Sequence, residues 1–129
     1  MTLLNVLRVG VGGGLGAMAR YWVGTWAQPS APGTAFPYAT LLVNVVGRLV
    51  IGGLAYQGEV RGVVTPEARL LLMTGFLGGF TTFSAFGNET MGLLRGGAAG
   101  TALAYVGAHL VLGLGAVWVG WALAQRLWS

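Results

Sequence analysis

The sequence predicts an all-α integral membrane protein with four transmembrane helices. Of its 129 residues, 55% are hydrophobic and only 8% are charged, and the mean hydropathy is +0.73. Soluble domains carry about 25% charged residues. A spanning helix takes roughly 20 residues, and four apolar runs of that length use nearly the whole chain. We therefore expect a single membrane domain over residues 1–129, with spans at about 4–27, 38–57, 69–94 and 98–124.

Helix-breaking sequences separate these four runs. Residues 28–37 contain three prolines and a glycine and cannot continue a helix. Thr65, Pro66 and Glu67 form the pattern of an N-cap, a first-turn proline and an acid that matches the helix dipole. This pattern predicts the start of the third helix. Arg95, which is followed by two glycines, predicts the turn into the fourth.

The charged residues restrict both function and topology. All seven basic residues are arginines spread singly along the chain, whereas nucleic-acid binding requires clusters. No cysteine is present, which excludes thiolate metal sites. Four crossings place both termini on one side of the membrane. The flanks on that side hold Arg8, Arg61, Arg69 and Arg126, against Arg20 and Arg95 on the other side. So weak a bias predicts a subunit that can insert in both orientations.

Polar residues inside the spans are costly in hydrocarbon and therefore mark candidate functional positions. In the second and fourth spans they recur at every fourth position, which places them on one helix face. They are Thr40, Asn44 and Arg48 in the second span and Thr101, Tyr105 and His109 in the fourth.

The third span gathers hydroxyl side chains around glycines, a composition of poor helix propensity. The residues are Thr74, Thr81, Thr82 and Ser84 around Gly75, Gly78 and Gly79. We expect the helix to break there. Non-helical backbone at membrane depth is tolerated only where protein or a water-filled cavity satisfies it, so a break indicates an ion site.

Two phenylalanines follow this stretch. Phe83 and Phe86 are three residues apart and would share a helix face. Spacing alone favours a packing role. Beside a break, however, the positive edges of aromatic rings can accept a small anion.

Three segments of the chain resemble the signature segments of the Fluc (CrcB) fluoride channels. They are residues 13–21, 40–47 and 75–86, in that order, and the third, GFLGGFTTFSAF, is the most specific. The resemblance covers essentially the whole chain. It implies a dual-topology homodimer of antiparallel subunits that exports fluoride passively through two pores in the bacterial inner membrane. Its partners would be a second copy of itself, fluoride and the lipid bilayer.

The resemblance also implies roles for individual residues. Phe83 and Phe86 would be the pore aromatics, and Asn44 an amide donor to fluoride. Polar pore residues would be Tyr105, Thr82, Ser84 and, from the polar face of the second span, Thr40.

Two further roles lie outside the pore. The backbone carbonyls of Gly78 and Thr81 would hold a structural sodium ion at the centre of the dimer, because carbonyl oxygens suit a hard cation. Arg20 would lie near the aqueous vestibule.

Two residues depart from the family pattern. Arg48 is either a snorkelled or Glu89-paired arginine that serves packing, or a vestibule charge that attracts anions. His109 is either a hydrogen-bonded structural residue or a vestibule group that makes conductance depend on pH.

Other classes of protein explain the sequence less well. A small proton-coupled multidrug exporter can have the same architecture, but it needs a membrane-embedded carboxylate, and Glu89 is the sole acid within any predicted span. A scaffold without transport leaves the polar faces unexplained. An enzyme would need a nucleophile, a base and an orienting group, which one histidine and three glutamates do not supply.

Overall fold

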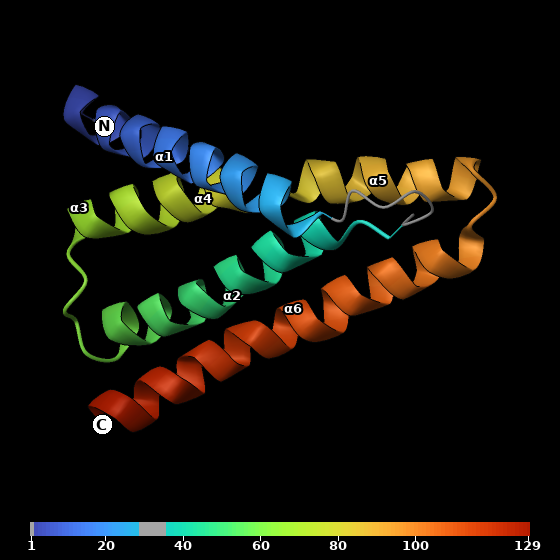
Figure 1. Cartoon of the computed structure of the whole chain (residues 1–129). Helices are drawn as coiled ribbons and strands as arrows, with labels where there is room; N and C mark the ends of the chain where they lie inside the picture. The colour runs from blue at the N-terminus through green and yellow to red at the C-terminus, as the bar shows by residue number, and fades with distance from the viewer. Residues whose placement is uncertain (1, 29–35) are drawn as a thin grey trace.

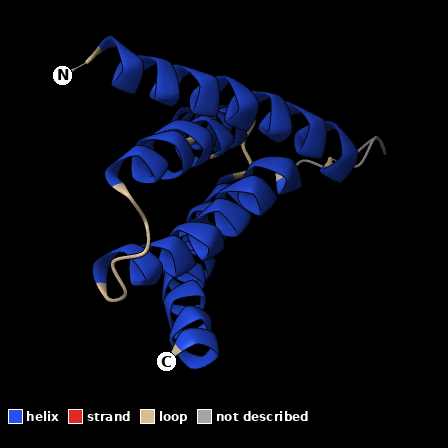
Figure 2. Ribbon diagram, turned by 90° about the vertical axis from the view of Figure 1, so that its left-hand side faces the viewer, coloured by secondary structure: helices blue, strands red, loops and turns tan. Residues whose placement is uncertain are grey.

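The chain folds into a bundle of helices, seen here in a computed structural model that describes residues 2–28 and 36–129. Every regular element within those ranges is helical (Figure 2). The first two helices are α1 (Leu3–Ala27) and α2 (Tyr38–Glu59), and the last is α6 (Ala99–Trp128). The third helix of the bundle is built from shorter pieces, described below.

The helices form two closely packed pairs (Figure 1). α1 lies along the first half of the third helix, and α2 lies along α6. The N-terminal end of α1 and the C-terminus of α6 lie at the same end of the bundle, while the turn that leads into α6 lies at the opposite end. Gly97 makes that turn possible because its φ of 78° is a left-handed conformation that suits glycine.

The third helix is interrupted in its middle. Its first half consists of α3 (Pro66–Ala68), the π-helical stretch η1 (Arg69–Leu77) and α4 (Gly78–Phe80). Thr81 and Thr82 are then extended, with ψ of 157° and 119°, before α5 (Phe83–Arg95) continues. Threonine caps begin both halves: Thr65 Oγ1 accepts from the Ala68 N–H at 3.2 Å and Thr82 Oγ1 from the Ala85 N–H at 3.1 Å.

The interruption lies later than the glycine content of the span suggested. Gly75, Gly78 and Gly79 remain helical, and the chain leaves the helix only at Thr81 and Thr82. Two of these glycines instead allow close helix packing. A Cβ on Gly75 would lie 2.9 Å from the Val9 carbonyl oxygen, and one on Gly79 would collide with the Gly13 carbonyl.

Glycine forms the same kind of seam elsewhere in the bundle. A Cβ on Gly12 or Gly16 of α1 would collide with backbone atoms of η1, and a Cβ on Gly52 of α2 would meet the Val117 carbonyl of α6. Small residues thus bring both helix pairs into backbone contact, the packing typical of helices in membranes.

Three helical segments are long and apolar enough to cross a membrane: Tyr38–Glu59, Pro66–Arg95 and Ala99–Trp128. α1 has 25 residues but is not among these three. The outer surface is apolar as well, with Leu103, Val111 and Trp118 each more than 70% exposed. The polar residues that are buried face the interior of the bundle, as lipid surroundings require.

Candidate functional site at the helix break

Asn44 pairs with the backbone groups of Thr82 that the helix break leaves without helical hydrogen bonds. Its Oδ1 accepts from the Thr82 N–H at 2.8 Å, and its Nδ2 donates to the Thr82 carbonyl at 2.9 Å. The side chain is 2% exposed. In this way α2 supplies the hydrogen bonds that the interrupted helix cannot make for itself, and a costly unpaired amide is avoided.

His109 of α6 accepts the second hydrogen bond that this amide can donate. Its Nε2 lies 3.1 Å from Asn44 Nδ2, and its Nδ1 lies 3.2 Å from the Tyr105 carbonyl oxygen. Both protons of Asn44 Nδ2 are therefore engaged. The amide can donate to an anion only if one of these hydrogen bonds is released.

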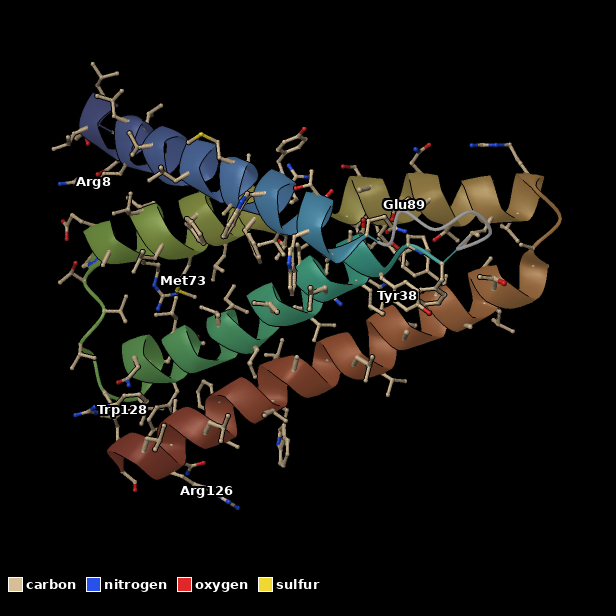
Figure 3. The ribbon with its side chains drawn as sticks, viewed as in Figure 1. Arg8, Tyr38, Met73, Glu89, Arg126 and Trp128 are labelled. Carbon is tan, nitrogen blue, oxygen red and sulfur yellow. The ribbon has the colours of Figure 1, made fainter. Side chains whose placement is uncertain are left out.

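Glu89 joins α5 to the polar faces of α2 and α6. Thr40 Oγ1 donates to its Oε1 at 2.8 Å, and the Tyr105 hydroxyl donates to its Oε2 at 2.5 Å. Thr40 and Tyr105 are 8% and 0% exposed. Figure 3 shows Glu89 on α5 toward the end of the bundle opposite Arg8 and Arg126. Glu89 was not among the site residues predicted from the sequence. The signal that could have identified it is that it is the only acid within any predicted span.

Arg48 lies on α2 one turn after Asn44, whereas Thr40 lies one turn before it. Its Nη1 donates to the His109 carbonyl at 2.8 Å, and its guanidinium lies against Gly113, where any side chain would collide with it. Glu89 is hydrogen-bonded to Thr40 and Tyr105, and no ion pair joins it to Arg48 among the described residues.

The two phenylalanines share a face, as expected from their spacing. Their ring centroids are 5.4 Å apart. Phe86 packs on Tyr105 at 5.5 Å and on His109 at 4.3 Å, whereas Phe83 is 77% exposed. Phe86 thus belongs to the polar cluster, and Phe83 projects from the surface next to the break.

Two open cavities flank the break, one on each side. The first, of about 210 Å³, lies between α2 and the third helix, and its lining combines apolar side chains such as Ile51, Met73 and Leu77 with Asn44, Arg48, Gly78, Thr81, Thr82 and Phe83. The second, of about 330 Å³, lies between α1, α2 and the start of α5, and its lining includes Arg20, Tyr21, Thr40 and Thr82. Arg20 Nε is buried without a hydrogen-bond partner among the described residues.

The remaining predicted residues lie at the edge of the cluster. Ser84 is exposed, and its Oγ lies 3.2 Å from Thr82 Oγ1. Thr81 Oγ1 donates to the Leu77 carbonyl at 2.8 Å, which holds the last turn before the break. Hydroxyls, an amide, aromatic rings and the N-terminus of α5 therefore converge on one non-helical point, a combination suited to a small anion.

Comparison with known proteins gives the family. The model of the family described as CrcB-like protein, Camphor Resistance (CrcB), matches residues 7–121. A fluoride-specific ion channel FluC of Chlorobaculum tepidum is 48% identical over 129 residues, which cover 100% of both chains. FluC of Thermus thermophilus is 46% identical over 127 residues, or 98% of each chain. FluC of Methylobacillus flagellatus is 42% identical over 123 residues, or 95% of this chain and 96% of the relative. The protein described here therefore belongs to the CrcB family.

Proposed function

We propose that this chain is a subunit of a fluoride-selective ion channel. The observation that carries the proposal is the convergence of hydroxyl, amide and aromatic groups on the Thr81–Thr82 break, in a chain whose near full-length relatives are named fluoride-specific ion channels. It is a multi-pass membrane protein, and its bacterial relatives indicate the inner membrane. Transport is passive export through two pores of a homodimer, and no chemical step is involved.

Fluoride passes along the polar face that α2 and α6 share. In this proposal Phe83 and Phe86 offer ring edges to the ion, and Thr82 and Ser84 offer hydroxyls. The N-terminus of α5 adds the positive end of a helix dipole at the same point. Each of these interactions is weak, which suits conduction because a permeating ion must leave as readily as it binds.

The hydroxyls at Glu89 act by exchange of hydrogen bonds. Thr40 and Tyr105 each have one hydroxyl proton, and both donate it to the carboxylate. A fluoride ion that arrives competes with Glu89 as the acceptor of these two hydrogen bonds. The hydroxyls donate to the carboxylate again when the ion leaves. Glu89 therefore keeps both hydroxyls oriented while its own negative charge discourages long residence of the anion.

A central sodium ion fits the backbone at the break. In a continuous helix the Gly78 carbonyl would accept from the Thr82 N–H and the Thr81 carbonyl from the Ala85 N–H. Those N–H groups donate instead to Asn44 Oδ1 and Thr82 Oγ1. Two carbonyl oxygens thus lose their helical partners, and they are hard ligands suited to sodium. The Gly78 and Thr81 carbonyls of each copy in an antiparallel dimer would hold the ion, which would supply positive charge there.

The cavities beside the break serve as vestibules. Arg20 lines one of them, and its buried Nε, which has no hydrogen-bond partner within the described part of the chain, supports a role in attracting anions. Arg48 lines the other, and its hydrogen bond to the His109 carbonyl leaves most of its guanidinium protons without a partner in residues 2–28 and 36–129, where solvent or an anion can accept them.

The test is efflux from liposomes that contain the purified protein, with fluoride and chloride compared side by side. We expect rapid loss of fluoride and no loss of chloride above that of protein-free liposomes. Equal rates for the two ions, or no fluoride efflux, would contradict the proposal. A proton-coupled exporter would instead move organic cations only when a pH gradient is imposed.

A further inference from the structure

The imidazole of His109 lies where α2, α6 and the helix break meet. The side chain is 2% exposed and is enclosed by groups from three elements. Asn44 Nδ2 approaches its Nε2, the Tyr105 carbonyl approaches its Nδ1, and the Phe86 ring covers it at a centroid distance of 4.3 Å. A chain of hydrogen bonds therefore runs from His109 through Asn44 to the backbone of Thr82.

The geometry determines which nitrogen of the ring carries a proton. The orientation of the Asn44 amide is unambiguous, because the Thr82 N–H can only donate and the Thr82 carbonyl can only accept. Asn44 Nδ2 must then donate its second proton toward His109, so Nε2 accepts with its lone pair. Nδ1 faces a carbonyl oxygen and must carry the proton. The ring is consequently neutral, in the Nδ1–H tautomer.

We infer that neutral His109 is a positioning residue for Asn44 and the helix break, and that protonation of the ring releases Asn44 and lowers ion flux. A proton on Nε2 would point at the amide protons of Asn44 and turn an attractive contact into a repulsive one. Asn44 cannot turn away without losing both hydrogen bonds to Thr82. Because Thr82 caps α5, the disturbance passes to Phe83, the first residue of that helix.

The charged and titratable groups around the ring act in opposite directions. Arg48 of α2 donates to the His109 carbonyl, and its positive charge opposes a second one on the imidazole. Glu89 of α5 favours that charge but faces the ring only through Tyr105, to which it is hydrogen-bonded. The direct neighbours of the ring nitrogens are one donor and one acceptor, and that pattern accommodates only the neutral form.

The tautomer can be tested without any measurement of transport. His109 is the only histidine in the chain, so the protein labelled with 15N-histidine gives the signals of a single imidazole. At about pH 7.5 we expect a protonated Nδ1 and an unprotonated Nε2. The opposite tautomer, or an imidazolium ion at that pH, would overturn the inference. So would a ring that shows no titration above about pH 4.5, two units below the ordinary range of histidine.

The flux part rests on the proposed function and uses the same liposomes. Fluoride efflux is measured from about pH 7.5 downward with equal pH on both sides, and the leak of protein-free liposomes is subtracted. Below the midpoint seen by 15N signals, flux should fall about tenfold for each pH unit, because each unit changes the neutral fraction tenfold. A constant flux through that midpoint would overturn the inference even if fluoride selectivity is intact.

The matched variant is His109→Gln. Its amide oxygen can accept from Asn44 but cannot titrate in this range. With each protein normalised to its own flux at about pH 7.5, the variant should lose the acid-dependent fall. It retains Glu89, so an equal fall in the variant would assign the pH dependence to that carboxylate and contradict the role of His109. Absence of fluoride flux from the wild-type protein at any pH would count against the proposed function and would leave the 15N test of the tautomer in place.

Discussion

At the scale of single residues, nearly every buried polar group at the break is matched to a specific partner. Asn44 uses its oxygen and both amide protons, and Glu89 accepts at both oxygens. An unpaired buried group costs about 1–3 kcal/mol in a protein interior, so such matching is expected inside a bilayer. Phe83 is different, because its ring is 77% exposed on the surface beside the break. Packing among the described residues of the chain does not explain its position.

Replacement of Phe83 tests whether its ring acts on the ion. Phe83→Ile keeps apolar bulk but removes the aromatic edge, so we expect fluoride efflux to fall at least about tenfold, as for a loss of roughly 1.5 kcal/mol. Size-exclusion chromatography should still show the elution volume of the wild-type protein.

Trp118→Ile is the control for this change. Trp118 is also exposed, at 71%, but lies on α6 in a groove with Leu114 and Trp121, away from the break. Its variant should keep wild-type efflux. Full retained flux in Phe83→Ile would refute the role assigned to the ring.

At the scale of elements, glycine seams set the distance between helices. Gly12 and Gly16 of α1 lie directly on the backbone of η1, and Gly13 lies under Gly79. This contact holds the first half of the third helix in place, so that the backbone of Thr82 reaches Asn44 on the neighbouring α2. A helix pair held apart by side chains would move the break away from its hydrogen-bond partners.

Substitution along α1 should therefore depend on which face is changed. In Gly16→Ala the new Cβ collides with the Phe76 carbonyl, whereas in Gly14→Ala no atom of the described residues lies within 4 Å of the new Cβ. We expect Gly16→Ala to lower the free energy of unfolding by about 1–3 kcal/mol, the usual cost of overpacking. Gly14→Ala should cause no loss, since alanine favours helix over glycine by about 0.8–1.0 kcal/mol. Thermal unfolding in the same detergent measures both, and equal melting temperatures would show that the seam does not control stability.

At the scale of the whole molecule, both ends of the chain reach the same end of the bundle, while Glu89 lies toward the other (Figures 1 and 3). An antiparallel dimer would place one copy of each end on each side of the membrane and would build two equivalent pores. The weak difference in arginine count between the two sides agrees with insertion in both orientations.

A single introduced cysteine tests this arrangement, since the chain has none of its own. Ser129→Cys places a thiol at the C-terminus, in an exposed position. A maleimide that cannot cross membranes, added to intact spheroplasts, should label about half of the protein if both orientations occur. Disrupted cells should allow complete labelling. Labelling of all or none of the protein in intact spheroplasts would establish one fixed orientation and exclude the antiparallel dimer.

Several features of this protein follow from the sequence alone. Composition and run length determine an all-helical membrane protein, because hydrocarbon demands long apolar segments with internal hydrogen bonds. Local or periodic patterns also predict three finer features from the sequence: the threonine cap at Thr65, the turn at Gly97 and the polar faces of α2 and α6. The presence of a break in the third helix also followed from its poor helix propensity.

The position of the break and the groups that complete it depend on how the helices pack against one another. Weak helix propensity and close packing are both typical of glycine. Gly75 and Gly79 pack against α1, Gly75, Gly78 and Gly79 all remain helical, and the chain leaves the helix only at Thr81 and Thr82. The partners of Asn44, Glu89 and Arg48 lie 16 to 65 positions away in the sequence. Such pairings depend on how the helices pack, because a residue's own helix determines its face but not its neighbour.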